Sequence, residues 1–550
     1  MSQGHIKKQA PKVDPSKLSA TLNNFLVIRL VVASVIFAVA LILDIPSFLR
    51  IVLLVVSAAL AGFDFIIKAF SAVENGEFLS SPVMLVLISV IAFFVGFAVE
   101  GAALVLLYQI GLLLLNFTKE HTKRAALDLV QDCDEDVVAH MKELAADEES
   151  CSMAIEEVMR SSAGTILRLA MLLAVIYAIA LPLFTSLSFL ISIHRALVIL
   201  LIATPLSVIA SIPVAGLVGL CSSAGRGLVF NNAYSMEAMA DASVAVIDKN
   251  GVFTDECPRV ISMFSDVLDQ DTFLNFVAHS VYYSEQPIAN AISAIFDHDY
   301  RLEVIKDFRE IPGAGVELSI DGIPVTFATA EYLRGRGLEI DPSDESVGQT
   351  YYMVVAGRKM GRVVISSDVN PNLENLVPEL KSVGIGRCIL LCEDGKEAGQ
   401  AFAEAMNFSE MYAQCTTPKK LKIVEETTQK TKGAVLFLYA VGIEQHSAAA
   451  VDIRVSKRAK YADAVVTADE LGSLPIVKRV SKRVRDICIE NALFAFIVKA
   501  VLIFLSIIGY CNLWLAVVLD FATAIATVLN TIRITGPSIR ANLKYRYGRQ

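Results

Sequence analysis

Long apolar runs divide the chain into membrane-like and polar parts. Four early stretches are almost continuously apolar, at about 25–43, 49–69, 82–98 and 101–116. Each is close to the roughly 20 residues that a helix needs to cross a bilayer. Four more such stretches follow, at about 165–190, 193–220, 490–510 and 513–533. The pattern therefore predicts about eight membrane-spanning helices, which lie within residues 23–116, 165–220 and 490–534.

The shorter polar segments predict the orientation of these helices. Residues 1–22 and 535–550 are tails that contain several Lys and Arg residues, and further basic residues lie at 119–124. An even number of spans places both termini on one side, and basic loops favour the cytoplasmic side. Residues 117–164 are rich in helix-forming residues and lack Pro, so we expect a short helical cytosolic linker there.

A large charged region between residues 221 and 490 alternates apolar strand-like runs with helix-like stretches. Residues 363–366 and 388–391 have the composition of buried strands, and a helical pattern at 397–406 follows them. This alternation predicts a doubly wound α/β domain. We assign it to residues 221–270 and 361–489.

The segment between these two parts has its own strand and turn signals. Apolar runs at 316–320 and 325–328 flank the turn Asp321-Gly322. We therefore expect residues 271–360 to form an inserted α/β domain. The fold class predicted from the pattern is a polytopic α-helical membrane protein with a doubly wound α/β domain and a second α/β domain inserted into it.

Composition agrees with this organisation and narrows the function. The 550 residues are 55% hydrophobic and 19% charged, and the mean hydropathy is +0.56, which indicates several membrane spans. The formal net charge of -9 argues against a nucleic-acid partner and leaves the lipid bilayer as the expected one. The nine Cys include no CxxC pair, so neither a disulfide framework nor a structural zinc site is expected. The first apolar run is long enough to remain a span rather than a cleaved signal peptide.

Asp248 is the strongest candidate for chemistry. It follows the apolar run at 244–247 and precedes a turn at Gly251, so it lies at the carboxyl end of a predicted parallel strand. Open α/β sheets bind and react with ligands at this end, and an Asp there can attack a phosphoryl group to form an aspartyl phosphate. Taken alone, the segment is equally consistent with a strand followed by an Asx-turn.

The surrounding residues carry a family resemblance. Residues 248–254 read DKNGVFT and resemble the DKTGTLT phosphorylation motif of P-type ATPases, with Asn250 and Val252 at altered positions. Together with the order of spans and the long insertion, they make most of the chain similar to heavy-metal P-type ATPases. The resemblance implies ATP and Mg²⁺ as cofactors. It also implies a catalytic site formed by Asp248, Lys249, Thr254, Asp394 and Lys420. For Lys420, a solvated surface lysine is the alternative interpretation.

Two motifs of the inserted domain fit the same family. Residues 284–288 read SEQPI and resemble the nucleotide-domain motif SEHPL, with Gln286 in place of the adenine-contacting His. Residues 312–316 read PGAGV and resemble PGxGV, whose glycines let the backbone approach a nucleotide. The resemblance therefore implies a nucleotide-binding role for Glu285, Gln286, Pro287, Gly313 and Gly315.

Two late membrane segments resemble the zinc, cadmium and lead exporters of this family. Residues 491–499 end in Lys499, residues 514–520 end in Asp520, and Asn530 follows downstream, as that subgroup's pattern requires. Independently of any family, a Lys or an Asp inside a membrane helix costs roughly 3 kcal/mol, so such residues usually pair or line an ion path. Two readings stay open: a transport path for Zn²⁺ or another divalent cation, with Thr204 and Pro205, or a structural Lys499–Asp520 ion pair.

The chain departs from the family in its transport and actuator motifs. Thr204-Pro205-Leu206 stands where the family has Cys-Pro-Cys, so the thiolates that select soft metals are absent, and Leu112 replaces a Glu. Pro205 is still expected to interrupt its helix. The family's TGE loop lies on a β-rich actuator domain, and residues 117–164 are too short to contain such a domain.

The motifs around the aspartate also depart. Aligned without gaps, the family's GDGxND motif falls on residues 439–444, so Ala440 replaces the main Mg²⁺ carboxylate and Glu444 replaces the second acid. The family's TGD becomes Cys392-Glu393-Asp394. A metal clamp on the transferring phosphoryl group supplies several kcal/mol, so its loss weakens the chemistry.

These losses together favour a heavy-metal P-type ATPase-like protein without an autonomous transport cycle. Such a pseudo-pump would have a regulatory or scaffold role, with a partner membrane protein or a second copy, in a prokaryotic plasma membrane. The alternative is an ATP-driven divalent-cation exporter that uses an actuator supplied by a partner. A membrane-tethered phosphatase is a third hypothesis and is the least favoured, because Asn250 occupies the position of the second acid that such enzymes need.

Overall fold

The computed structural model describes two compact units. It covers residues 15–535 apart from gaps at 77, 79, 185–186, 255–258, 266, 285, 312–313, 341–348, 367–369, 441 and 457–460. One unit, the membrane unit, comprises the described parts of Met1–Ala125, Ala154–Ala215 and Ile487–Gly536. The other, the α/β unit, comprises the described parts of Ala126–Met153 and Gly216–Asp486.

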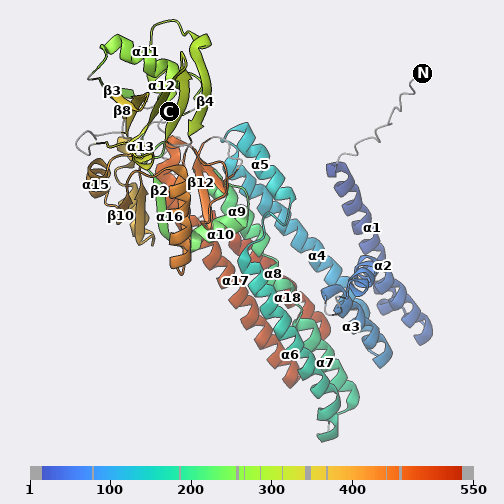
Figure 1. Ribbon diagram of the computed structural model, residues 1–550. Helices are drawn as coiled ribbons and strands as arrows, with labels where there is room; N and C mark the ends of the chain where they lie inside the picture. Colours follow the sequence, from blue (N-terminus) through green and yellow to red (C-terminus); the bar gives the residue numbers. More distant parts are fainter. Residues whose placement is uncertain are drawn as a thin grey trace, which may run out of the picture. The chain divides into compact units, whose positions relative to one another are not determined.

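Apolar helices form the membrane unit. Seven helices among the described residues are long and apolar enough to cross a membrane. In chain order, the helices that lie wholly or partly in this unit are α1 (Pro15–Ile42), α2 (Ser47–Glu74), α3 (Ser81–Val95), α4 (Ala98–Leu127), α6 (Ala154–Phe184), α7 (Phe189–Ile202), α8 (Leu206–Ile209), α9 (Ile212–Ala224), α17 (Leu474–Ile508), α18 (Leu513–Asn530) and η6 (Thr531–Thr535) (Figure 1).

The predicted apolar segments are all helical, but two differ in detail from simple spans. Helix α3 has only 15 residues, because Gly96 adopts a left-handed φ of 96° and ends it. At 1.5 Å per residue it is shorter than a bilayer's hydrocarbon core. The segment expected at 193–220 is interrupted at Pro205, between α7 and α8, as the sequence indicated.

A seven-stranded sheet forms the first domain of the α/β unit. Its neighbouring strands are parallel, except that β1 is antiparallel to β13. This is the doubly wound domain predicted from the sequence. In spatial order the strands are β1 (Leu228–Phe230), β13 (Ala464–Val466), β12 (Val451–Val455), β11 (Ala434–Tyr439), β2 (Ala242–Asp248), β9 (Arg387–Leu391) and β10 (Glu410–Tyr412).

Helices accompany this sheet and bury its apolar strands. Val246, Ile389 and Phe437, from three adjacent strands, belong to one fully buried cluster. The helical elements are α10 (Ala233–Asp241), η4 (Pro371–Leu373), α14 (Leu376–Ser382), α15 (Lys396–Ala405), α16 (Thr417–Lys430) and η5 (Ala468–Ser473).

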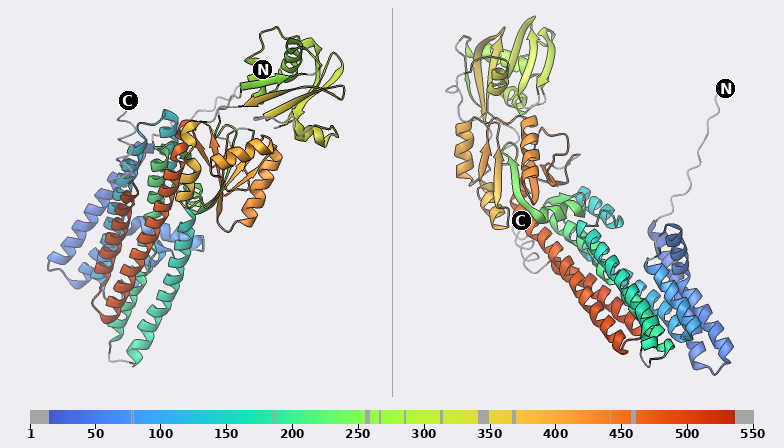
Figure 2. Two further views of the ribbon diagram at one scale, coloured as in Figure 1. Left: turned by 90° about the vertical axis from the view of Figure 1, so that its left-hand side faces the viewer. Right: turned by 60° about the horizontal axis from the view of Figure 1, so that its bottom comes forward.

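A six-stranded antiparallel sheet forms the second domain of the α/β unit (Figure 2). Its order is β3 (Arg259–Phe264), β8 (Arg358–Ser366), β7 (Gln349–Val355), β6 (Ile323–Thr329), β5 (Gly315–Ile320) and β4 (Ile305–Ile311). Phe273 of α11 and Ile292 of α12 pack with Phe327 in its core. The helical elements are α11 (Gln270–Val281), α12 (Pro287–Ser293), η2 (Leu302–Val304) and α13 (Ala330–Gly335).

One strand assignment from the sequence is wrong. Residues 363–366, expected in the doubly wound sheet, lie in β8 and pair antiparallel with β3 and β7 of the second sheet. The inserted domain therefore includes strands from both sides of the expected range 271–360. A short apolar run has the same composition in a parallel and in an antiparallel buried strand, so the pattern alone could not assign it.

The linker between α4 and α6 is helical, as predicted. All residues from 117 to 164 are described, and they contain η1 (Asp128–Val130), α5 (Glu135–Ala146) and no strand. The linker packs closely on α9, because a Cβ at Gly216 would lie 2.2 Å from the carbonyl oxygen of Cys151. The backbone N–H of Ala233 also donates to the carbonyl of Ser150 (2.9 Å). The linker is thus part of the α/β unit.

Candidate functional site

Asp248 lies at the carboxyl end of β2, in the middle of the seven-stranded sheet. Strand β2 is parallel to β9 and β11 on its two sides, and its apolar side chains are buried. Asp248 is in register with Leu391, and the N–H of Lys249 donates to the Leu391 carbonyl (2.9 Å). The loop after β9, which contains residues 392–394, therefore begins beside Asp248. This is the edge where parallel sheets place their ligand-binding groups.

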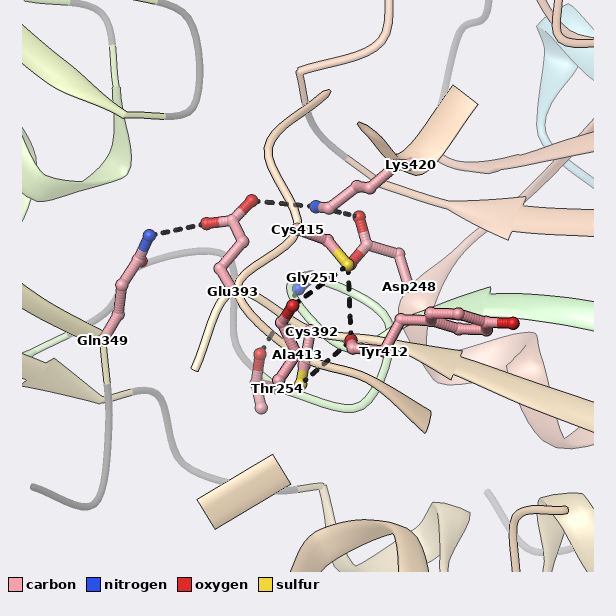
Figure 3. Close-up of polar contacts among 10 residues, drawn as sticks. All are labelled: Asp248, Gly251, Thr254, Gln349, Cys392, Glu393, Tyr412, Ala413, Cys415 and Lys420. Atoms are coloured by element: carbon pink, nitrogen blue, oxygen red, sulfur yellow. Dashed lines mark hydrogen bonds and ion pairs between the residues drawn. The ribbon is translucent and has the colours of Figure 1, made fainter. Parts of the chain in front are cut away.

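Lys420 joins Asp248 to a second carboxylate. Its Nζ donates to Asp248 Oδ2 at 2.6 Å and to Glu393 Oε1 at 2.8 Å (Figure 3). Lys420 and Asp248 are buried, with 2% and 1% of their surfaces exposed. The prediction that Lys420 belongs to the site is consistent with this geometry, and the alternative of a solvated surface lysine is wrong. Glu393 Oε2 in turn accepts a hydrogen bond from Gln349 Nε2 at 2.7 Å.

The other predicted residues of the motif surround this ion pair. Lys249 forms an ion pair with the buried carboxylate of Asp394, and its ammonium lies 5.0 Å from the centre of the Phe402 ring. Thr254 Oγ1 accepts a hydrogen bond from the N–H of Gly251 (3.3 Å), which closes the turn after β2. The structure thus brings all five predicted catalytic residues to one edge of the sheet.

The ionisable groups of this site shift each other's pKa values. Burial raises the pKa of Asp248, Lys420 lowers it in part, and the Glu393 carboxylate raises it again. Burial alone would lower the pKa of Lys420, but the carboxylates of Asp248 and Glu393 raise it above its ordinary value. Burial also raises the thiol pKa of Cys392 to about 12 and that of Cys415 to about 11, so both thiols are neutral at pH 7.

The residues around Asp248 do not fit the Mg²⁺ that the resemblance implies. Ala440 follows β11, is buried, and uses its carbonyl to accept a hydrogen bond from Arg454 Nε (3.2 Å). Glu444 is exposed to solvent. Asp248 Oδ1 is buried and has no hydrogen-bond partner among the described residues, but Lys420 holds its other oxygen. The nearby carboxylates of Glu393 and Asp394 are paired with Lys420 and Lys249, so a divalent cation at this position would lack a free second carboxylate.

The two nucleotide-like motifs have structural partners inside their own domain. Gln286 Nε2 donates to the carbonyls of Ile311 (2.9 Å) and Gly315 (3.2 Å), so its amide bridges the end of β4 and the start of β5. Gly315 has a φ of 135°, and a Cβ there would lie 2.1 Å from the Phe327 carbonyl oxygen. Pro287 opens α12. Glu285 and Gly313 lie outside the described residues. The contacts explain the glutamine and Gly315 without a nucleotide.

The membrane unit contains a second buried lysine–carboxylate site. Lys499 Nζ donates to Asp520 Oδ1 (2.7 Å) and to the carbonyls of Ile202 (2.7 Å) and Thr204 (2.8 Å). An ammonium has three donors, so all of them are used. Pro205 interrupts the helix between α7 and α8 beside these carbonyls, and Ser207 Oγ also donates to Asp520 Oδ1 (2.7 Å). The structural ion pair, one of the two readings open from the sequence, is present.

Sequence reasoning missed the roles of three residues. Glu393 was visible only as a departure from the TGD motif, and its added carboxylate was the available signal. Ser207 lies two residues after Pro205, and a hydroxyl near an interrupted helix was a weak signal. No sequence signal pointed to Gln349, because its contact with Glu393 depends on how two domains approach each other.

Comparison with known proteins finds similarity to metal-transporting ATPases. The cadmium, zinc and cobalt-transporting ATPase of Bacillus subtilis is 26% identical over 352 residues, which cover 62% of this chain and 50% of the relative. The zinc-transporting ATPase of Synechocystis is 23% identical over 351 residues, which cover 62% of this chain and 48% of that protein. This membrane protein is therefore similar to heavy-metal P-type ATPases.

Structural comparison agrees at the level of the fold. A zinc-transporting PIB-type ATPase in its E2·Pi state superposes on this ATPase-like chain with a TM-score of 0.56 at 17% identity, covering 92% of this chain and 99% of that one. The chain spans about half the length of the curated relatives it matches. No family model matches this chain.

Proposed function

We propose that this ATPase-like protein does not carry out an autonomous ATP-driven transport cycle and instead has a regulatory or scaffold role in the membrane. The observation that carries the proposal is the arrangement at Asp248. Lys420 is bound by Asp248 and Glu393 together, and Ala440 supplies no second metal-binding carboxylate. Phosphoryl transfer needs cationic groups free to neutralise the transferring group, and these are already neutralised by the protein's own acids.

The membrane site supports the same proposal. A cation transported along this path would compete for Asp520 Oδ1 and the carbonyls of Ile202 and Thr204, to which the Lys499 ammonium already donates. The Thr204 hydroxyl donates to the Leu201 carbonyl at 3.0 Å and is therefore engaged at the end of α7. Zn²⁺ or another divalent cation, as a transported substrate, would have to displace a buried and fully hydrogen-bonded lysine.

The linker supports the proposal in a different way. Residues 126–153 pack on α9 and α10 through direct backbone contacts and contain a single α-helix. In the family that the chain resembles, a β-rich actuator domain drives hydrolysis of the aspartyl phosphate. A short helical linker held against the α/β unit offers no such domain.

Steady-state ATP hydrolysis in lipid bilayers tests this proposal. The full chain, reconstituted and supplied with ATP and Mg²⁺, should show the same background rate with and without Zn²⁺ or Cd²⁺. Asp248→Asn should leave that rate unchanged. A metal-stimulated rate that disappears in Asp248→Asn would refute the proposal.

The alternative of an exporter that uses an actuator supplied by a partner also has an observation in its favour. Asp248 ends β2 beside β9, and Lys249 pairs with Asp394 next to it, which brings together three residues that a phosphorylation site would use. This alternative predicts that the chain purified alone is silent, while membranes that contain its partner show Asp248-dependent, metal-stimulated hydrolysis. The absence of such activity in native membranes that contain the chain would count against it.

We also propose that both termini are cytoplasmic, in a prokaryotic plasma membrane. The basic tails and the apolar helices motivate this orientation. Reporter fusions at each end provide the test: both should be active only with a cytoplasmic reporter. A periplasm-active fusion at either end would contradict the orientation.

A further inference from the structure

Glu393 places a carboxylate on Lys420, the same lysine that binds Asp248. It lies in the loop after β9, between Cys392 and Asp394, at the middle position of the segment that resembles the family's TGD motif. A glycine at that position leaves space beside the lysine, whereas a glutamate fills it. The side chain of Glu393 is largely buried, with 18% of its surface exposed.

Both carboxylate oxygens of Glu393 have dedicated partners. Oε1 accepts from Lys420 Nζ at 2.8 Å, and Oε2 accepts from Gln349 Nε2 at 2.7 Å (Figure 3). Lys420 comes from α16 of the doubly wound domain, and Gln349 begins β7 of the inserted domain. Both partners are themselves buried, with 2% and 8% exposed. The carboxylate is therefore positioned from two domains and is not a freely rotating surface group.

Three further donors near Asp248 are also engaged. The Cys392 thiol donates to the Tyr412 carbonyl (3.5 Å), and the N–H of Gly251 donates to Thr254 Oγ1 (3.3 Å). Lys249 is paired with Asp394. A phosphate group next to Asp248 would need Lys420 as its cationic partner and would meet the Glu393 carboxylate already bound there, at close range and largely shielded from water.

We propose that Glu393 is the resident anion of the Asp248 site: its carboxylate takes the place of a phosphate group on Lys420 and makes the site reject phosphate-bearing ligands. Gln349 is the positioning residue that holds this carboxylate in place. The inference rests on the proposed function and deepens it, because it identifies the residue that determines what the site excludes.

Binding of inorganic orthophosphate tests the inference without ATP or metal. Isothermal titration of the full-length protein in detergent should show no binding by the parent chain at millimolar phosphate. Glu393→Gly and Glu393→Gln should each bind at least tenfold more tightly than the parent. Gln349→Leu, which frees one carboxylate oxygen, should show a smaller gain. Combining Glu393→Gly with Lys420→Met should abolish the gain, because the anion then lacks its cation.

Glu331→Gln is the matched control. Glu331 lies 3.9 Å from Lys419 and is half-exposed. Its conversion to Gln changes the net charge by the same amount as the Glu393 variants do, but it leaves the Glu393 carboxylate bound to Lys420. It should leave phosphate binding at the parent level. The inference is overturned if neither Glu393 variant gains affinity while both retain the parent's unfolding temperature, or if the parent or Glu331→Gln binds as tightly as they do. Phosphorylation by ATP, which tests the proposed function, is a separate readout and can fail independently.

Discussion

The two buried lysine–carboxylate sites solve the same electrostatic problem in different ways. In the membrane unit, Lys499 faces one carboxylate and two backbone carbonyls, so charge is balanced and every ammonium donor is used. In the α/β unit, Lys420 faces two carboxylates, and Asp248 Oδ1 is left without a partner among the described residues. In the first site the positive and negative charges balance. In the second site the carboxylates outnumber the lysine, and both of them depend on Lys420 as their cationic partner.

This difference explains why the two sites should respond differently to the same kind of mutation. Removing one partner of a buried ion pair leaves the other charge unpaired in a medium of low dielectric constant, which costs more than the pair itself contributes. In the membrane no water is available to reduce this cost. In the α/β unit the partly exposed Glu393 keeps some contact with solvent.

Lys499→Met should have the largest effect, because it leaves Asp520 charged and unpaired among apolar helices. We expect a loss of about 3–5 kcal/mol in the free energy of unfolding in detergent micelles. Adding Asp520→Asn should recover most of the loss, since the second change removes the unpaired charge. If Lys499→Met unfolds at the same denaturant concentration as the parent, the two groups are not paired as described.

Lys420→Met should have a somewhat smaller effect of about 2–4 kcal/mol, because Glu393 retains partial hydration. The pKa of Lys420 is raised in the folded protein, so its contribution is fully present below the lysine's unfolded pKa near 10.4 and is lost as pH rises through the folded pKa. Alkaline unfolding monitored by circular dichroism should therefore lose this pH dependence in the variant. A parent-like alkaline transition would contradict the assignment.

Ser207→Ala tests the second contact of the membrane carboxylate. Ser207 Oγ donates to Asp520 Oδ1, but Lys499 remains bound after the substitution, so the expected loss is about 1 kcal/mol. Thermal unfolding in micelles, with Ser34→Ala as the control, should resolve the difference. Ser34 Oγ donates only to the Leu30 carbonyl within its own helix. Equal losses in both variants would show that the Asp520 contact has no special weight.

Arg387→Gln provides an exposed reference for the two buried sites. Arg387 Nε and Nη2 donate to Glu410 at 2.7 and 2.6 Å, but both side chains are about 40% exposed. Hydrogen bonding to Arg387 lowers the pKa of Glu410, so the pair stabilises the fold above the ordinary glutamate pKa near 4.3 and loses this effect as pH falls. We expect less than about 1 kcal/mol at neutral pH and none in strong acid. A larger loss in denaturant titrations would remove the contrast with the buried pairs.

The sequence could predict the elements that depend on residues close to one another in the chain. The apolar runs gave the membrane helices, the β-branched residues before Asp248 gave β2, and Pro205 gave the interruption between α7 and α8. Lys420 and Lys499 were found because a charged residue stood in a motif or inside an apolar run. The structure brings the five predicted catalytic residues together and pairs Lys499 with Asp520.

The features that could not be predicted depend on the pairing of distant segments. Residues 363–366 form an antiparallel strand because β3 and β7 lie beside them. The composition of a strand does not determine which strands pair with it. The contact between Glu393 and Gln349 requires two domains to meet. Ala440 was predicted as a missing Mg²⁺ ligand, but only the structure shows that its carbonyl is bound by Arg454.

Trapping of a phosphorylated enzyme tests the central claim most directly. The purified full chain is incubated with γ-labelled ATP and Mg²⁺, with and without Zn²⁺, and quenched in acid beside an Asp248→Asn control. Because Lys420 is already bound by Asp248 and Glu393 and no second carboxylate clamps a metal, we predict no label above the control. An acid-stable label that is present in the parent and absent from Asp248→Asn would contradict this account.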